Sequence, residues 1–205
     1  MVGIVNYNIG NLASVLNALV KVGAKAQIEK EPSRLLQYDR LILPGVGAFG
    51  DAMEHLVQSG MKEAVLEFAK SGKPLLGICL GMQLLFEKSY EFGEHAGLGL
   101  LEGEIIPFDK TRMGEGYKIP QMGWNRFYTK KASPLLKGLE EGFYLYYVHS
   151  FHAMAKREED VLGESVYGYP FVSAIERDNV AGFQPHPEKS HDAGLRILKN
   201  FCEIG

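Results

Sequence analysis

Cysteine is scarce in this chain of 205 residues, and no stretch is rich in charge of one sign. The two cysteines, Cys79 and Cys202, lie far apart without Cys-x-x-Cys spacing, which argues against a disulfide framework or a zinc site and fits a reducing compartment. The 22 Lys and Arg residues against 25 Asp and Glu residues leave a formal charge of -3, with no basic run that could follow a phosphate backbone. We therefore expect no nucleic-acid partner, no metal and no other cofactor.

Long hydrophobic runs and linkers are also lacking. The most apolar stretch, residues 74–86, is interrupted by Gly77, Gly81 and Gln83 and is shorter than the ~20 residues that a membrane helix needs. Residues 1–5 lack the basic segment of a signal peptide. We expect a cytoplasmic protein without a membrane contact. Because no Pro/Ser-rich linker, internal repeat or low-complexity tract divides the sequence, residues 1–205 are predicted to form a single domain.

The hydrophobic pattern predicts an α/β fold. In the first half, short apolar runs alternate with helical periods; the expected strands are 2–6, 24–29, 40–43 and 74–78, and the expected helices are one between Gly10 and Gly23, 51–58 and 61–70. Strands without polar alternation, each followed by a helix, indicate a mostly parallel sheet flanked by helices.

From about residue 103 the pattern changes to β-branched and aromatic runs separated by turn residues. These runs predict antiparallel strands added to the sheet, at 124–129, 143–148, 161–167, 171–176 and 180–184. A last helix is predicted at 189–202, and Cys202 on its apolar stripe is expected in the core. The third expected strand, 40–43, should stop at Pro44 and Gly45.

A Gly-x-Cys-x-Gly pattern at residues 77–81 stands at a predicted strand-to-helix junction. A nucleophile elbow needs small residues two before and two after the nucleophile, because the turn is too tight for side chains there. Cys79 fits this requirement, and the backbone N–H of Leu80 then faces an oxyanion forming on a substrate carbonyl. The alternative is that Cys79 is only a small hydrophobic residue packed at the end of a strand.

A thiol nucleophile needs a base, and His186 and Glu188 offer one late in the chain. Pro187 keeps His186 out of the helical region, and residues two apart in an extended segment project to the same side, so Glu188 can lie beside the imidazole. Cys79, His186 and Glu188 then form a catalytic relay. On its own, a histidine between prolines is more often a turn residue.

Two further patterns are given less weight. His149 and His152 form a His-x-x-His, but on a strand they face opposite ways, which disfavours a metal site; His55, His95 and His191 are expected at the surface. Residues 45–50 spell Gly-x-Gly-x-x-Gly, the dinucleotide-binding pattern, yet they follow the third expected strand and no acidic ribose ligand follows the next one. We interpret this segment as a glycine-rich strand end whose N–H groups complete an oxyanion hole with Leu80.

Residues 77–83, 44–47 and 186–188 together resemble the class I, triad-type glutamine amidotransferases. Further segments are similar to the glutaminase subunits of imidazole glycerol phosphate synthases, namely 8–12, 44–49, 122–125, 147–151 and 186–190. These segments span nearly the whole chain. One departure is Pro185, where the family usually has Phe.

The resemblance implies that the Cys79 thiolate attacks the side-chain amide of L-glutamine. His186 then protonates the departing ammonia and activates the water that hydrolyses the thioester, and Glu188 orients His186. It further implies that Gln83 contacts the substrate, and that oxyanion and substrate-binding groups come from Val46, Gly47, Leu80, His149 and Ser150.

The resemblance also implies a partner. Because the pattern occupies the whole sequence, no residues remain for a domain that uses the ammonia, and a separate cyclase subunit with a (β/α)₈ barrel is expected to form a heterodimer with this chain. In such a heterodimer, the ammonia is channelled to the cyclase subunit, which makes imidazole glycerol phosphate and aminoimidazole carboxamide ribotide in histidine biosynthesis. The docking face is expected to include Asn11, Ser14, Trp124, Tyr146 and Lys189.

Three alternatives remain open at this point. The chain could serve as the amidotransferase subunit of another pathway. It could be a stand-alone cysteine hydrolase or peptidase on the same elbow, with no need of Gln83 or the segment 122–125. It could also be a regulatory binding module in which Cys79 is inert or senses redox state, although the presence of His186 and Glu188 counts against this.

Overall fold

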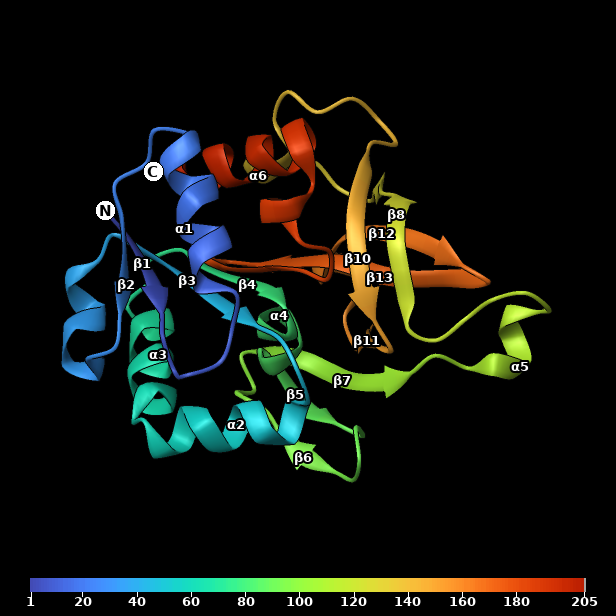
Figure 1. The fold of residues 1–205 in the computed structure, drawn as a ribbon, viewed down its shortest axis with the longest axis horizontal. Helices are drawn as coiled ribbons and strands as arrows, with labels where there is room; N and C mark the ends of the chain where they lie inside the picture. Colours follow the sequence, from blue (N-terminus) through green and yellow to red (C-terminus); the bar gives the residue numbers. More distant parts are fainter. Residues whose placement is uncertain (205) are drawn as a thin grey trace.

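A twisted central sheet runs through the protein, and the computed structural model describes residues 1–204 of it (Figure 1). The strands are β1 (Val2–Val5), β2 (Ala26–Glu29), β3 (Arg40–Gly45), β4 (Leu75–Cys79), β5 (Phe86–Ser89), β6 (His95–Ala96), β7 (Leu101–Pro107), β8 (Gln121–Arg126), β9 (Tyr128–Thr129), β10 (Tyr144–His149), β11 (Phe151–Ala155), β12 (Val161–Tyr167), β13 (Tyr169–Arg177) and β14 (Val180–Phe183). The α-helices are α1 (Leu12–Lys21), α2 (Phe49–Gln58), α3 (Met61–Lys70), α4 (Leu80–Leu84), α5 (Lys110–Met113) and α6 (His191–Glu203), and the 3₁₀ turns are η1 (Pro32–Gln37), η2 (Pro134–Leu136), η3 (Glu158–Asp160) and η4 (Pro187–Lys189).

The main sheet has the strand order β2-β1-β3-β4-β14-β13-β11-β7-β5-β6; β12 also pairs with β13, and β9 pairs with β12. The first five strands in this order are parallel, and β13, β11 and β7 follow in antiparallel pairing. Every residue of β1 and of β4 is buried, as expected for central parallel strands covered on both faces. The carboxyl ends of β3 and β4 therefore meet at one edge.

Helices cover the two faces of the parallel strands. α1 and α6 lie on one face and α2 and α3 on the other (Figure 1). Two buried clusters match this division: Val15, Leu19 and Leu198 belong to one, and Leu56 and Phe68 to the other. Each fully buried aliphatic or aromatic side chain of this kind contributes about 1.5–3 kcal/mol, so the sheet is held rigidly from both sides.

A second, two-stranded sheet of β10 and β8 stands across the main sheet (Figure 1). The strands are antiparallel, with Tyr146 opposite Trp124 and His149 opposite Gln121. The backbone N–H of His186 donates to the carbonyl of Tyr146 at 2.9 Å, and the hydroxyl of Ser190 accepts from the N–H of Tyr146 at 2.9 Å. These bonds tie the segment after β14 to β10.

The expected fold class is confirmed: one α/β domain with a mostly parallel sheet and added antiparallel strands. Some expectations about its parts are wrong. The segment 180–184 is antiparallel to β13 as expected, but it also pairs in parallel with β4. Most of the segment 124–129 pairs with 144–149 in the separate sheet, while β9 pairs with β12, and β5, β6, β7 and β11 were not predicted. Alternation within a strand reports which face is buried, but not which neighbour it pairs with.

Two predicted boundaries also change. β3 continues through Pro44 and Gly45. Pairing between β1 and β3 ends at Ile42, so beyond that point one side of β3 needs no backbone donor and a proline is tolerated. The predicted helix 189–202 is divided into η4 and α6, with Ser190 between them. Within residues 1–204, no helix is both long and apolar enough to span a membrane.

Candidate active site

Cys79 lies at a sharp turn between β4 and α4, as the glycine pattern predicts. Its φ is +54°, a left-handed conformation that costs a residue with a side chain about 1–3 kcal/mol. A Cβ atom on Gly81 would lie 1.8 Å from the carbonyl oxygen of Leu43, and one on Gly77 would lie 2.7 Å from the backbone of Met82. Both glycines are therefore required for β4, α4 and β3 to meet this closely, which leaves Cys79 at the tip of the turn.

Gly81→Ala should lower the free energy of unfolding by about 3 kcal/mol or prevent folding, because the new methyl group overlaps a backbone oxygen that cannot move aside. Gly23→Ala is the matched control. A Cβ there has no atom within 4 Å, although φ is +81°, so only the conformational cost of about 1 kcal/mol is expected. Urea denaturation of both variants measures the difference; equal losses would contradict the steric account of the elbow.

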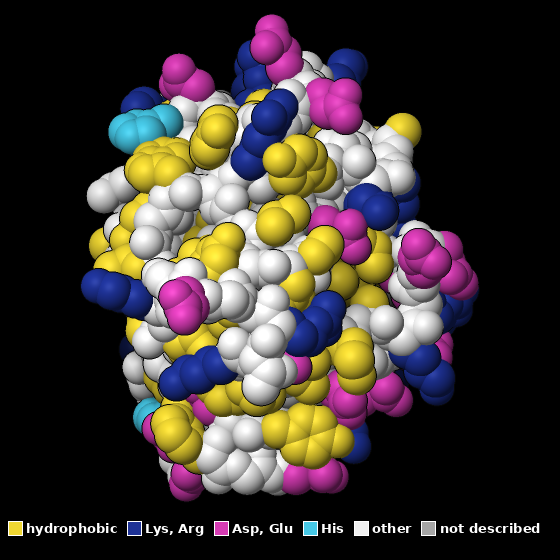
Figure 2. Space-filling view, turned by 90° about the vertical axis from the view of Figure 1, so that its right-hand side faces the viewer, with side chains coloured by type: hydrophobic (Ala, Val, Ile, Leu, Met, Phe, Trp, Pro, Cys, Tyr) yellow, Lys and Arg dark blue, Asp and Glu magenta, His cyan; other side chains and the backbone are white. Residues whose placement is uncertain are grey.

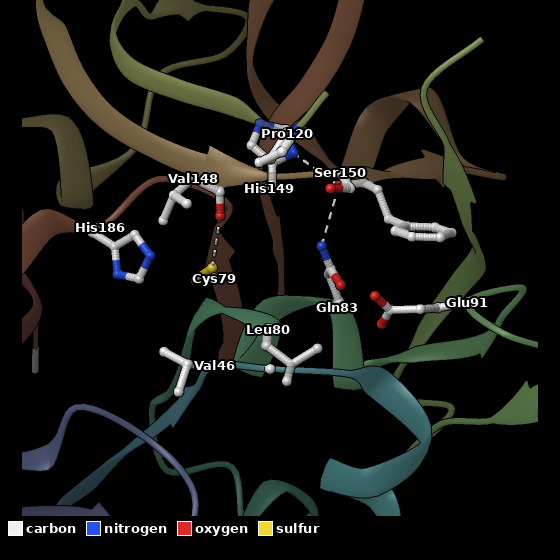
Figure 3. A pocket seen from close by; sticks show the side chains of 12 residues that line it. Val46, Cys79, Leu80, Gln83, Glu91, Pro120, Val148, His149, Ser150 and His186 are labelled. Atoms are coloured by element: carbon white, nitrogen blue, oxygen red, sulfur yellow. Dashed lines mark hydrogen bonds between the residues drawn. The ribbon is translucent and has the colours of Figure 1, made fainter. Parts of the chain in front are cut away.

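His186 and Glu188 form a buried pair. Nδ1 of His186 lies 2.7 Å from Oε1 of Glu188, and their side chains are 2% and 1% exposed. Because an ionised carboxylate can only accept, Nδ1 carries a proton in this pair and Nε2 is left to exchange one. Nε2 is buried and has no hydrogen-bond partner among the described residues, and Figure 3 shows the ring beside Cys79.

The electrostatic setting of His186 favours its charged form. Burial lowers the pKa of this imidazole, but the neighbouring Cys79 sulfur and the Glu188 carboxylate raise it more, to about 10. An imidazolium is the partner that a thiolate needs. The predicted proximity of His186 and Glu188 is confirmed, but its predicted cause is wrong, because Glu188 lies in the 3₁₀ turn η4 rather than in an extended segment. Pro185 does not prevent the contact.

The residues implied as substrate-binding groups line one cavity of about 260 Å³ (Figure 3). The predicted residues on its wall are Val46, Gly47, Cys79, Leu80, Gln83, His149, Ser150 and His186. They come from the ends of β3, β4 and β10, from α4 and from the loop after β14. The cavity thus joins a thiol, an imidazole and several backbone amides at the carboxyl edge of the parallel strands, the usual place for a site in an open α/β sheet.

Comparison with known proteins agrees with this geometry. The sequence profile described as "Glutamine amidotransferase class-I" matches residues 4–204. The chain belongs to the class-I glutamine amidotransferase family.

The similarity to named relatives covers the full length of this amidotransferase. The chain is 98% identical, over 100% of both sequences, to a Wolinella succinogenes protein named "Imidazole glycerol phosphate synthase subunit HisH". It is 60% identical to a protein of the same name from Sulfurimonas denitrificans, covering 99% of this chain and 98% of that one. Among solved structures, "Structure of PurLQS from Thermotoga maritima" matches with a TM-score of 0.77 at 19% identity, covering 98% and 97% of the two chains. That structure supports the fold alone.

Gln83 of the amidotransferase has a fixed orientation in the cavity. Its Nε2 donates to the carbonyl of Phe151 at 3.2 Å and to Oε1 of Gln184 at 2.9 Å. A backbone carbonyl can only accept, so the amide cannot be reversed. Oε1 of Gln83 is thereby left as an acceptor on the cavity wall, and Figure 3 shows it near Glu91.

Glu91 is a cavity residue that reasoning from the sequence missed. It lies two residues after β5, and its Oε2 accepts from the N–H of Phe49 at 2.6 Å. Burial raises the pKa of this carboxyl above its ordinary value, partly offset by that hydrogen bond. The only signal in the sequence was one Glu in a segment where no strand was predicted, so nothing placed it beside the elbow.

His149 contributes to the cavity wall from a buried position. One ring nitrogen lies 2.8 Å from the carbonyl of Phe151 and the other 3.0 Å from Oε1 of Gln121. Burial lowers the pKa of His149 to about 3, so the ring is neutral near pH 7. The expectation that His149 and His152 face opposite ways is wrong, because they lie on different strands and both rings contact Phe108. Within residues 1–204, no three His, Cys, Asp or Glu side chains form a metal-binding group.

The glycine-rich segment 45–50 lies beside the elbow, with Gly45 paired with Cys79. Gly47 has φ of +94°, and a Cβ atom added to it would have no other atom within 4 Å, so its peptide planes have room to turn. Val46 is 40% exposed. An oxyanion donor in this segment therefore comes from a peptide that has room to change its orientation.

The residues expected at a docking face are near the His186–Glu188 pair. Trp124 is 47% exposed, stacks on His191 with ring centroids 5.0 Å apart and meets Tyr146 edge-on at 6.1 Å. Ser14 and Lys189 line one surface cavity together with Glu188 and His191; Asn11 caps α1 by accepting from the N–H of Ser14. Figure 2 shows hydrophobic side chains spread among charged ones on the neighbouring face, where β8 and the end of β12 lie.

The remaining predicted positions agree in part. His191 is exposed as expected, whereas His55 and His95 are half-buried. Cys202 was expected in the core, but it is only half-buried, packed against the cluster under α6.

Proposed function

We propose that this chain is the glutaminase subunit of imidazole glycerol phosphate synthase and that Cys79, His186 and Glu188 are its catalytic residues. It hydrolyses L-glutamine to glutamate and ammonia, and the ammonia passes to a separate cyclase subunit in histidine biosynthesis. The observation that carries the chemistry is the buried His186–Glu188 pair beside a cysteine on a strained elbow. The pathway is supported by the full-length similarity to proteins named as this subunit.

Hydrolysis proceeds through a thioester. The proton of the Cys79 thiol passes to Nε2 of His186, the sulfur bonds to the amide carbon, and the carbonyl electrons move to the oxygen. Backbone N–H groups of Leu80 and of the segment 46–47 stabilise that oxyanion. The C–N bond then breaks, and the nitrogen leaves as ammonia with the proton from His186. Water attacks the thioester, gives its proton to His186, and the thiol is restored as glutamate leaves.

Substrate orientation follows from two acceptors on the cavity wall. Oε1 of Gln83 and the carboxylate of Glu91 both face the site, and a substrate α-ammonium supplies three donors. Charge-assisted bonds of this kind are stronger than neutral ones. The α-carboxylate is then turned toward backbone N–H groups near Ser150, and the side-chain amide extends to Cys79.

The cyclase subunit is expected to be a (β/α)₈ barrel that forms a heterodimer with this chain. It docks over a face that includes Asn11, Ser14, Trp124, Tyr146 and Lys189. The exposed aromatic cluster around Trp124 and its nearness to Glu188 support this placement, since aromatic side chains are common anchors of interfaces. We further propose that residues 1–205 are one amidotransferase domain and that the complex works in the cytoplasm.

The test is release of glutamate by the chain in complex with the cyclase subunit. L-Glutamine should be hydrolysed, and L-asparagine should react about a hundredfold or more slowly, because its side chain is one methylene too short to reach Cys79 while its ammonium is held by Glu91 and Gln83. Enzyme-coupled assays of glutamate and of aspartate measure the two rates. Equal rates, or cleavage of peptides instead, would favour the stand-alone hydrolase.

A further inference from the structure

Gln184 is a fully buried polar residue at the end of β14, between that strand and His186. Its side chain makes two contacts. Oε1 accepts from Nε2 of Gln83 at 2.9 Å, and Nε2 points to Sγ of Cys79 at 3.8 Å. A buried amide needs partners for both ends, and here one of the two partners is the reacting sulfur.

The orientation of Gln184 is fixed by its neighbours. Gln83 must present Nε2 to the backbone carbonyl of Phe151. The same Nε2 meets Gln184, so Gln184 must offer its oxygen on that side and its NH₂ group on the side of Cys79. The backbone carbonyl of Phe151 can only accept, and this alone fixes the orientation of both amides, Gln83 and Gln184, between it and the Cys79 sulfur.

We propose that Gln184 is a catalytic residue that donates a hydrogen bond to the Cys79 thiolate, in addition to the relay of Cys79, His186 and Glu188. The inference rests on the proposed role of Cys79 as nucleophile. In the thiol form, Sγ donates toward the carbonyl of Val148 at 3.9 Å. When the proton moves to Nε2 of His186, that carbonyl repels the negative sulfur, whereas the Gln184 NH₂ group attracts it.

The same contacts link substrate recognition to the nucleophile. Oε1 of Gln83 is an acceptor for the substrate ammonium, and Nε2 of the same side chain donates to Gln184. Bonds in such a chain polarise one another, so binding of the ammonium strengthens the donor at the sulfur. The other titratable groups around Cys79 are His186, Tyr7, His149 and Glu91; the variants below leave all four in place.

The decisive experiment is the pH profile of alkylation of Cys79 by iodoacetamide in the full chain, followed at that residue by peptide mass so that Cys202 does not contribute. Gln184→Met keeps the bulk of the side chain and removes the donor without adding charge. The midpoint of the profile should rise by about one pH unit. Asn200→Leu is the control, because Asn200 is a buried amide bonded to the carbonyls of Leu135 and Lys137; its midpoint should stay that of the unaltered chain.

Gln184→Glu distinguishes two roles for Gln184: donating a hydrogen bond to the Cys79 sulfur, or only holding Gln83 in place. Its carboxylate still accepts from Gln83, so KM for glutamine should stay within about twofold, whereas kcat in the cyclase complex should fall about 30-fold because a negative oxygen replaces the donor. An unchanged alkylation midpoint in folded Gln184→Met, or a raised KM with unchanged kcat in Gln184→Glu, would overturn the proposal. Thermal melts identify a variant that has not folded, and the other variant then decides. Since alkylation needs no glutamine, this result stands apart from the test of the glutaminase function.

Discussion

Cys79→Ala should abolish glutamine hydrolysis by the complex, with a loss of about a thousandfold or more, and should leave the fold intact. The thiol supplies the bond-forming atom, and no other side chain on the cavity wall can replace it. The remaining rate reflects only binding and the oxyanion donors. Because Cys79 is 7% exposed and alanine adds no polar group, thermal melting should change little.

The other cysteine provides the control. Cys202 is half-buried on α6, away from the cavity, and Cys202→Ala should hydrolyse glutamine at the rate of the unaltered chain. Steady-state glutamate release, measured with saturating partner, compares the two variants. Persistent activity in Cys79→Ala, or an equal loss in Cys202→Ala, would remove Cys79 from its assigned role.

The isolated chain should hydrolyse glutamine slowly, and the cyclase subunit with its ligand should accelerate it about a hundredfold. The structural reason is the segment 45–47, where a Cβ atom on Gly47 would meet no other atom within 4 Å, so the peptides next to Gly47 have room to turn. If the oxyanion-binding orientation is populated near 1% in the free chain, a partner that favours it can raise the rate by at most about a hundredfold. One of the proposed docking residues, Asn11, lies next to this segment, since Asn11, Val46 and His186 line a common small cavity.

This acceleration is measured as kcat for glutamate release by the chain alone, with the cyclase, and with cyclase and ligand together. A change in kcat with little change in KM is expected, because the oxyanion donor acts on the transition state. Rapid hydrolysis by the isolated chain that does not respond to the partner would show that the segment is already in its active orientation.

The elbow could be predicted from the sequence because it depends on local geometry. Gly77 and Gly81 are required by close approaches that only glycine allows, and the alternation of apolar strands and helices indicates which edge the turn occupies. The proximity of His186 and Glu188 was also predictable, since they stand only two positions apart along the chain. Such features need no knowledge of which strands are neighbours.

Glu91 and Gln184 show where prediction from the sequence stops. Gln184 reaches Cys79 because β14 pairs in parallel with β4; the sequence pattern predicts the antiparallel pairing that β14 makes with β13, but not this second neighbour. Glu91 reaches the cavity because β5 packs beside β7 at the far side of the sheet, and neither strand was predicted. Both side chains are brought to the site by strand order, which is set by packing across the whole domain and leaves no local pattern.

The central claim is that this chain uses Cys79 only to make ammonia from glutamine for a separate synthase subunit. The most direct measurement is product formation by the assembled complex carrying Cys79→Ala, with glutamine or with high ammonium at alkaline pH, where free NH₃ is appreciable, as the nitrogen source. The account predicts no imidazole glycerol phosphate from glutamine and an undiminished rate from ammonium. Equal failure with both sources, in a complex shown to be assembled, would contradict it, because this chain would then take part in the synthase reaction itself.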